Sequence, residues 1–366
     1  MNLFPNLKST YSKEQYSAKE AQQLAHIYSF GPVIFQVARL MIKYGIFEML
    51  SNIKEGLTYE EIEEKTGLSH YAVKCLMEAS LTMQTILIEP ETNKFKLAKT
   101  GWFLLNDPLI RVDIDFNHDV NYEGWFLLEE ALKEGKPAGL KHFGNWPTIY
   151  EGLSSLPKDV QKSWFGFDHY YSDNSFDEAL NIIFQNNTKT LMDVGGNTGR
   201  FASNCVKFNK NVEVTICDLP QQIELMKQHT SNIDGVERIK GIGINLLDAT
   251  QHFPSNINFD AIWMSQFLDC FGEDEIVSIL SRTTEVMTTD SRLYIMETLW
   301  DRQKYTSAAF CLTQISLYFT ALANGNSKMY NTDDMLNCIE KANLTIECIH
   351  DNIGLGGHSI IVCKLK

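Results

Sequence analysis

Seven short apolar segments recur through the second half of the sequence, starting at residue 188. They read TLMDVGG, VEVTICDLP, ERIKGIGINLL, FDAIWMSQFL, RLYIMETLW, LTIECIHDN and HSIIVCKLK, and stretches with helical spacing, such as EDEIVSILSRTTEVM, separate them. Continuous apolar strands that alternate with helices are typical of a mostly parallel sheet covered by helices on both faces. The pattern therefore predicts an α/β domain in this half of the chain.

The first of these strands runs into a glycine-rich loop, LMDVGGNTGRFA. Gly195, Gly196 and Gly199 allow a tight turn that a ligand can approach, and a helix starting near Arg200 aims free N–H groups at the same place. The loop therefore indicates a nucleotide-like ligand. It does not fit the dinucleotide fingerprint, which would need glycine at positions 197 and 200, and the G-K-S/T of a phosphate-binding loop is absent.

Two acids accompany this loop. Asp193 precedes the glycines, and Asp218 ends the following strand in ICDLP. A carboxylate at that strand end can accept hydrogen bonds from a ribose diol. The spacing therefore fits a ribose-containing ligand, and the alternative is that Asp218 is a strand-end acid without function.

The N-terminal third has the order of a winged helix-turn-helix. Thr58 and Glu61 form a capping box, Gly67 makes a turn, Ser69 caps a second helix, and LIEPETNKFKLAKTG predicts a two-stranded wing. The preceding segment VIFQVARLMIKYGIFEML is too apolar to face water alone, so we expect it to pack in a homodimer. Residues 113–185 look helical and are expected to bridge the two halves.

The charge balance disfavours nucleic acid and membrane as partners. The 366 residues carry a formal net charge of −14, and the second helix of the winged motif offers only His70 and Lys74 as cations against Glu78. No segment approaches the roughly 18 uninterrupted apolar residues of a membrane span. Eight scattered cysteines without a C-x-x-C pair, and no leader-like N-terminus, predict a cytoplasmic protein with free thiols and no metal site.

With these features in this order, the sequence resembles the S-adenosylmethionine-dependent small-molecule O-methyltransferases of the caffeic acid and phenazine methyltransferase kind. The resemblance covers almost the whole chain. It implies a Rossmann-like seven-stranded methyltransferase domain closed by an antiparallel last strand, with S-adenosyl-L-methionine as cofactor. It also implies a mostly α winged-helix dimerisation domain over residues 1–112, and a helical bridge and methyltransferase domain over residues 113–366.

The resemblance carries a cofactor site over to this sequence. It consists of Asp193, Gly195, Gly196, Asn197, Gly199, Asp218, Leu219, Asn245, Leu246 and Ser265. Three positions depart from the family pattern. Asn197 replaces a glycine, which is tolerable because asparagine enters left-handed conformations readily. Asn245 stands where an acid is usual, and Ser265 replaces a lysine.

The resemblance also carries over a catalytic and acceptor site. The histidine base of the family aligns with Asp269, Glu297 matches an acid that flanks the base, and Met329 stands where a second flanking acid is expected. Asn117 and Asn324 match positions that contact a phenolic substrate. Aromatic residues between 146 and 171 are expected to form core and domain interface in preference to a substrate wall.

Asp269 is a weak base by its ordinary pKa. An aspartate near 4 is mismatched to a phenol near 10 by about six units, where histidine is mismatched by less than four. We therefore expect Asp269 to orient the acceptor, or to accept a proton from an unusually acidic hydroxyl or a cationic amine. The alternative is a strand-end acid that faces solvent, and His118 or His169 is then the next candidate base.

The sequence thus predicts a homodimeric, metal-independent methyltransferase that acts on an oxygen or nitrogen of a small, planar metabolite. Two other readings stay open. One is a relative that binds the cofactor but performs other chemistry, and the other is a winged-helix transcriptional regulator with a metabolite-sensing domain.

Overall fold

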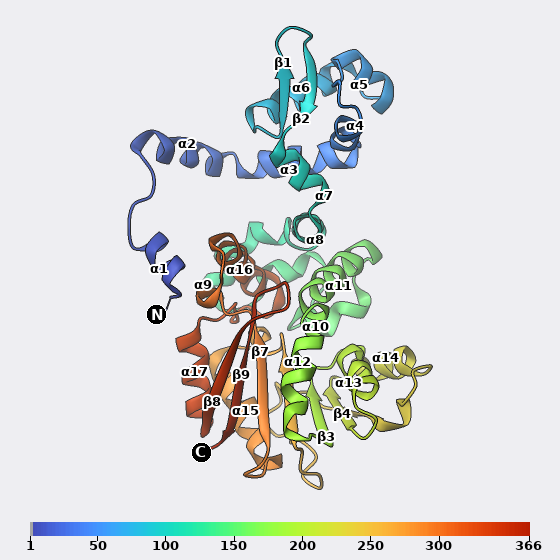
Figure 1. Ribbon diagram of the computed structural model, residues 1–366, viewed down its shortest axis with the longest axis vertical. Helices are drawn as coiled ribbons and strands as arrows, with labels where there is room; N and C mark the ends of the chain where they lie inside the picture. The colour runs from blue at the N-terminus through green and yellow to red at the C-terminus, as the bar shows by residue number, and fades with distance from the viewer. Residues whose placement is uncertain (1–2) are drawn as a thin grey trace. The chain divides into compact units, whose positions relative to one another are not determined.

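The computed structural model describes residues 3–366, which divide into two compact units (Figure 1). The N-terminal unit comprises residues 14–119, and the sheet unit comprises the described residues up to 13 together with Val120–Lys366. The division falls inside the predicted bridge and not at the predicted boundary between residues 112 and 113. The reason is that α8 (Pro108–Phe116) contacts α7 (Lys99–Asn106) and stays with the N-terminal unit.

The N-terminal unit contains the predicted helix, turn, helix and hairpin in that order. Its remaining elements are α2 (Ala18–Ser29), α3 (Gly31–Lys43), α4 (Ile46–Asn52), α5 (Tyr59–Thr66), α6 (His70–Thr82), β1 (Ile86–Glu89), β2 (Lys94–Leu97) and a π-helical turn (Asn117–Asn121) that runs into the sheet unit. The capping box of Thr58 and Glu61 is present, Gly67 ends α5 at φ +71°, and Ser69 caps α6. These local signals set the helix ends because each supplies a partner to an otherwise free backbone group.

The sheet unit is built on seven strands in the order β5-β4-β3-β6-β7-β9-β8. All seven predicted strands are present: β3 (Thr190–Val194), β4 (Glu213–Asp218), β5 (Ile239–Gly243), β6 (Ala261–Ser265), β7 (Arg292–Glu297), β8 (Leu344–Ile353) and β9 (His358–Leu365). The first five strands in this order, β5, β4, β3, β6 and β7, pair in parallel with their neighbours. Strand β9 is antiparallel to both β7 and β8. The predicted antiparallel closing strand is therefore confirmed.

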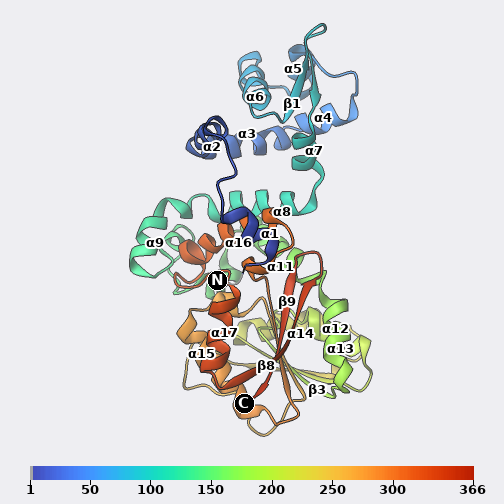
Figure 2. The ribbon, with the colours of Figure 1, turned by 60° about the vertical axis from the view of Figure 1, so that its left-hand side comes forward.

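Helices cover both faces of this sheet (Figure 2). They are α12 (Phe176–Ile183), α13 (Arg200–Phe208) and α14 (Pro220–Thr230) on one face, and α15 (Glu273–Thr283) and α17 (Thr332–Lys341) on the other. The sheet unit also contains α1 (Pro5–Tyr11), α9 (Leu128–Glu134), α10 (Ile149–Gly152), α11 (Lys158–Asp173) and α16 (Thr306–Tyr318).

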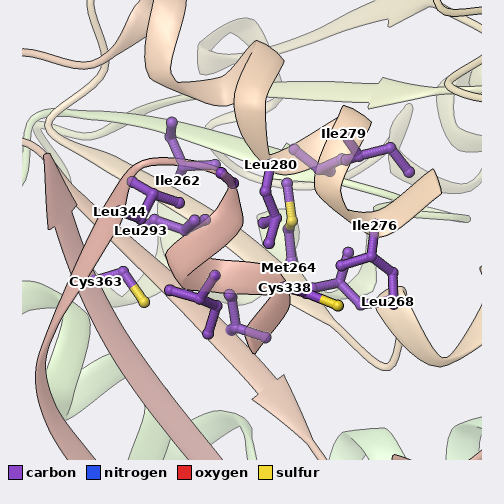
Figure 3. Close-up of a cluster of buried hydrophobic side chains, with 14 of the residues drawn as sticks. Ile262, Met264, Leu268, Ile276, Ile279, Leu280, Leu293, Cys338, Leu344 and Cys363 are labelled. Atoms are coloured by element: carbon purple, nitrogen blue, oxygen red, sulfur yellow. The ribbon is translucent and has the colours of Figure 1, made fainter. Parts of the chain in front are cut away.

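Two apolar clusters hold the layers together because side chains alternate across each strand. Ile262 and Met264 of β6 join the cluster under α15 and α17, which Figure 3 shows. Ala261 and Trp263 of the same strand join the opposite cluster under α12 and α13. This two-sided burial explains why the strands are continuous apolar runs in the sequence.

Among the described residues, one stretch, Thr306–Ala323, is apolar enough by length and composition to cross a membrane, with a mean hydropathy of 1.3. It is 44% buried inside the sheet unit, and core helices of folded domains pass the same test. The expectation that nothing spans a membrane therefore stays a prediction.

Candidate functional site

The glycine loop joins β3 to α13 through three residues in the left-handed backbone conformation. Gly195, Asn197 and Gly199 have φ of +74°, +49° and +79°. A side chain at Gly195 is also excluded by space, because its Cβ would lie 2.3 Å from Cδ2 of Phe267. Asn197 adopts the left-handed conformation expected of it. The N-terminus of α13, beginning at Arg200, follows directly, so its free N–H groups point to the loop.

Asp218 holds the loop from the end of the neighbouring strand β4. Its Oδ2 accepts a hydrogen bond from the Asn197 N–H at 2.8 Å, and its Oδ1 accepts one from the Leu219 N–H at 2.6 Å. Burial raises the pKa of Asp218 to about 6, against the lowering effect of these two bonds. Each carboxylate oxygen keeps a further lone pair, so the residue can still accept hydrogen bonds from a diol.

Three buried polar atoms around this loop have no hydrogen-bond partner within the described chain: Asp193 Oδ2, Asn197 Oδ1 and Ser265 Oγ. Burial, and then the charge of Asp218, raises the pKa of Asp193 to about 8. A Cβ at Gly196 would lie 2.7 Å from Asp193 Oδ2, so the carboxyl packs directly beneath the loop. Unpaired buried polar groups are costly, and their grouping here fits a polar ligand that would satisfy them.

The residues expected at the adenosine follow β5. Asn245 donates its N–H to Gln251 Oε1 at 2.9 Å, and its own Oδ1 accepts the Leu247 N–H at 3.0 Å. Leu246 is buried in the apolar cluster under α15 and α17, and its carbonyl oxygen accepts a hydrogen bond from Arg282 Nη2 at 2.6 Å. The Asn245 oxygen therefore already accepts one hydrogen bond within its own turn, and the adenosine contacts of Asn245 and Leu246 stay predictions.

Asp269 lies in a short helical turn, Leu268–Cys270, just beyond β6. It is only 4% exposed, so the alternative of a solvent-facing acid is wrong. Burial raises its pKa to about 7, and the Cys270 thiol lies 3.4 Å from its Oδ1. A pKa of about 7 is close to that of a free histidine. The gap between the pKa of Asp269 and that of a phenol is therefore about half the gap expected for an ordinary aspartate.

Glu297 ends β7 and holds the turn that carries Asp269. It is 2% exposed, and its Oε1 accepts hydrogen bonds from the N–H groups of Phe267 at 3.1 Å and Leu268 at 2.8 Å. Its Oε2 has no partner within the described chain. Burial, and then the charge of Asp269, raises the pKa of Glu297 well above its usual range. It is therefore not an ordinary solvated acid.

A second acid near Asp269 escaped the sequence analysis. Asp168 of α11 has its pKa raised to about 7 by burial and then by the charge of Asp269. Trp164, one turn earlier on the same helix, donates a hydrogen bond to Tyr318 Oη at 2.7 Å. Burial raises the pKa of Tyr318, and the charges of Asp168 and Asp269 add to that effect. No local sequence pattern marks this cluster, because α11 and α16 lie far apart along the chain.

The predicted acceptor contacts have diverse surroundings. Asn324 donates to the Cys270 carbonyl at 2.6 Å, and its oxygen accepts from the Ser327 hydroxyl at 2.6 Å, so its carboxamide braces the loop behind Asp269. Met329 is buried and accepts a weak hydrogen bond from Thr298 at its sulfur. Asn117 belongs to the N-terminal unit. Acceptor contacts of Asn117, Asn324 and Met329 stay predictions.

The structure also locates His118 and His169, the next candidates for the base after Asp269. His118 lies in the N-terminal unit, 3.9 Å from Asp119, and burial lowers its pKa. His169 is on α11, 3.3 Å from Arg200, and burial and then the charge of Arg200 lower its pKa. Neither histidine is among the groups that shift the pKa of Asp269, and their roles as alternative bases stay predictions.

Comparison with known families follows the same division of the chain. Residues 22–95 match the Dimerisation2-like domain, and residues 127–337, more than half of the chain, match the O-methyltransferase domain. The chain belongs to the O-methyltransferase family. This family uses S-adenosylmethionine, so the predicted family and cofactor are confirmed.

Characterised relatives are distant. The chain is 24% identical to norreticuline-7-O-methyltransferase of Papaver somniferum over 50% of its own length and 47% of that enzyme. It is 21% identical to demethylspheroidene O-methyltransferase of Rhodobacter capsulatus, over 89% of this chain and 78% of that enzyme. It is 22% identical to acetylserotonin O-methyltransferase of Homo sapiens, over 59% of this chain and 64% of that enzyme. The chain thus spans between about half and four fifths of these enzymes.

Solved structures agree in fold. The mitomycin 7-O-methyltransferase MmcR has a TM-score of 0.70 at 18% identity, covering 95% of this chain and 98% of that one. The protein NcsB1, in complex with S-adenosylmethionine and 2-hydroxy-5-methyl naphthoic acid, has a TM-score of 0.67 at 16% identity, covering 91% and 96%. The predicted α/β methyltransferase fold is therefore confirmed.

Proposed function

We propose that this protein transfers the methyl group of S-adenosylmethionine to a hydroxyl oxygen of a small, planar metabolite, with Asp269 at the reacting oxygen. The observation that carries the proposal is the buried Asp269 at the carboxyl end of β6, with a pKa near 7. In open α/β sheets, ligands lie beyond the carboxyl ends of the strands, and β3, β4 and β6 all end on this side.

The residues of the glycine loop would hold the cofactor. Asp218 would accept hydrogen bonds from the ribose, and the N–H groups at the start of α13 would face the amino-acid part. Asp193, Asn197 and Ser265 offer the unpaired polar atoms already described. When bound, the cofactor supplies a methyl group already activated on a sulfonium, so the protein's task is in-line positioning and removal of a proton.

Asp269 would receive that proton. In the transfer the acceptor oxygen forms a bond to the methyl carbon, the bond from methyl to sulfur breaks, and the hydroxyl proton moves to the Asp269 carboxylate. With a pKa near 7, roughly half of the carboxyl groups are ionised at neutral pH. Glu297 would act by fixing the turn through the Phe267 and Leu268 N–H groups.

A nitrogen acceptor is the second candidate, and the charge balance favours it. Asp269 is buried and Asp168 is half-buried, and the cation that acts on the pKa of Asp168 is Arg200, which already pairs with Asp173. A protonated amine would neutralise this pair of carboxyls, because a buried carboxylate is stabilised by an opposite charge. Asp269 would then accept the ammonium proton before transfer.

A homodimer and a cytoplasmic location are further parts of the proposal. The match to a Dimerisation2-like domain supports the dimer, as do the exposed apolar residues Tyr28 on α2, Val33 on α3 and Phe30 between these helices. Eight free cysteines support a reducing compartment.

The test is incubation with methyl-labelled S-adenosylmethionine and a metabolite extract, followed by identification of the labelled product. Asp218→Ala serves as a control with impaired cofactor binding. Label in a small molecule from the wild type, and much less from the variant, is the expected result. No labelled product, together with salt-sensitive binding to duplex DNA, would favour a transcriptional regulator instead.

A further inference from the structure

Gln266, the residue between β6 and the Asp269 turn, has an unusual backbone. Its φ is +46°, in the left-handed region that favours glycine. Its N–H donates to the Met296 carbonyl at 2.9 Å, which continues the pairing of β6 with β7 for one more residue. A non-glycine residue in this conformation persists when surrounding contacts hold it, and such residues gather at functional sites.

The side chain of Gln266 supplies one of those contacts. Its carboxamide lies 3.3 Å from Nε2 of His358, the first residue of β9. His358 is 0% exposed, and burial lowers its pKa to about 4, so the ring is neutral at physiological pH. The hydrogen bond forms with either ring tautomer, because a carboxamide can present its oxygen or its NH₂ group.

The same turn touches both halves of the site. The ring of Phe267 lies against Gly195 of the glycine loop, which is the proposed cofactor loop. A Cβ at Gly195 would lie only 2.3 Å from Cδ2 of Phe267. Glu297 Oε1 holds the Phe267 and Leu268 N–H groups, and Asp269 comes next. A displacement of Gln266 would therefore move the wall of the cofactor loop and the carboxyl together.

We propose that His358 and Gln266 form a positioning pair that fixes the cofactor loop and Asp269 relative to one another. His358 acts from β9 through Gln266 and touches no reacting atom in this scheme. The part that concerns Asp269 rests on the proposed function, and the part that concerns the cofactor loop does not.

Two substitutions of His358 separate this role from a merely structural one. Glutamine places an amide nitrogen near the position of Nε2, whereas asparagine reaches only as far as Nδ1. We expect His358→Asn to weaken binding of S-adenosylhomocysteine about tenfold by calorimetry, and to lower kcat at saturating cofactor by a further tenfold or so. His358→Gln is expected to keep both within about threefold of the wild type, with unfolding midpoints showing that both variants fold.

Gln266→Gly is the second variant, and it serves if His358→Asn fails to fold. Glycine keeps the left-handed backbone and loses only the side-chain bond, so losses like those of His358→Asn are expected. The proposal is overturned if the asparagine and glutamine variants of His358 are equally impaired, or if His358→Asn or Gln266→Gly matches the wild type. A wild type that binds S-adenosylhomocysteine but methylates nothing contradicts the proposed function alone, and the binding data still decide the pair.

Discussion

Replacement of Asp269 by asparagine should stabilise the cofactor-free protein at alkaline pH. Burial raises the pKa of this carboxyl from 3.8 to about 7. Each pKa unit corresponds to about 1.4 kcal/mol, so the ionised carboxylate destabilises the fold by up to roughly 4 kcal/mol. Asparagine has nearly the same shape and no charge to bury, so it removes this cost.

The sign follows from proton uptake. Between pH 4 and 7 the folded protein holds a proton on Asp269 that the unfolded chain has lost, so the contribution of this group to stability falls as pH rises through that window. With a pKa of 3.8 in the unfolded chain and about 7 in the folded protein, Asp269→Asn should stabilise the fold by about 3 kcal/mol more at pH 8 than at pH 4.5.

Urea unfolding at the two pH values, followed by tryptophan fluorescence, measures this difference. Trp263 is buried in β6 and reports on the sheet unit. The matched control is Asp234→Asn at an exposed position, where a surface substitution is expected to change the stability by no more than about 0.5 kcal/mol. An Asp269→Asn variant that is equally stable relative to wild type at both pH values, or less stable at pH 8, would refute the reasoning.

Three further predictions follow from the site and the N-terminal unit. Asp218→Ala should weaken binding of S-adenosylmethionine and S-adenosylhomocysteine at least tenfold by calorimetry, because the Asn197 N–H loses its acceptor, while NAD binds neither protein detectably. Gly195→Ala should abolish cofactor binding, because Gly195 has a φ of +74° and its new Cβ would collide with the ring of Phe267. The control Gly166→Ala, which has open space around it on α11, should bind the cofactor normally and gain about 0.5–1 kcal/mol of stability. Light scattering should show a dimer that Phe30→Glu converts to monomer, because Phe30 is 61% exposed on an apolar face; a monomeric wild type would contradict this.

The sheet was predictable because each strand is apolar on both faces, as Ala261 to Met264 illustrate. The closing antiparallel strand and the cofactor followed from the family resemblance, and the glycine loop and DLP carried that resemblance. Asn197 was predictable in addition from elementary stereochemistry, because asparagine tolerates the left-handed conformation that the loop imposes.

The character of Asp269 was not predictable from its neighbours in sequence. Its pKa depends on burial by the surrounding elements, and α10, α11 and α16 that carry Tyr150, Asp168 and Tyr318 lie far away along the chain. The division into two compact units between residues 119 and 120 likewise depends on the contacts of α8 and not on a change of composition. Local patterns determine elements, whereas tertiary burial determines proton affinity.

The most direct test of the account is the rate of methyl transfer, once the acceptor is identified, in the wild type, Asp269→Asn and Asp269→His. The account predicts a wild-type rate that rises with pH through about 7, a loss of more than tenfold in Asp269→Asn, roughly 1.4 kcal/mol of barrier or more, and partial retention in Asp269→His. An asparagine variant within tenfold of the wild type, with the same pH dependence, would show that Asp269 is a bystander and would return attention to His118 and His169.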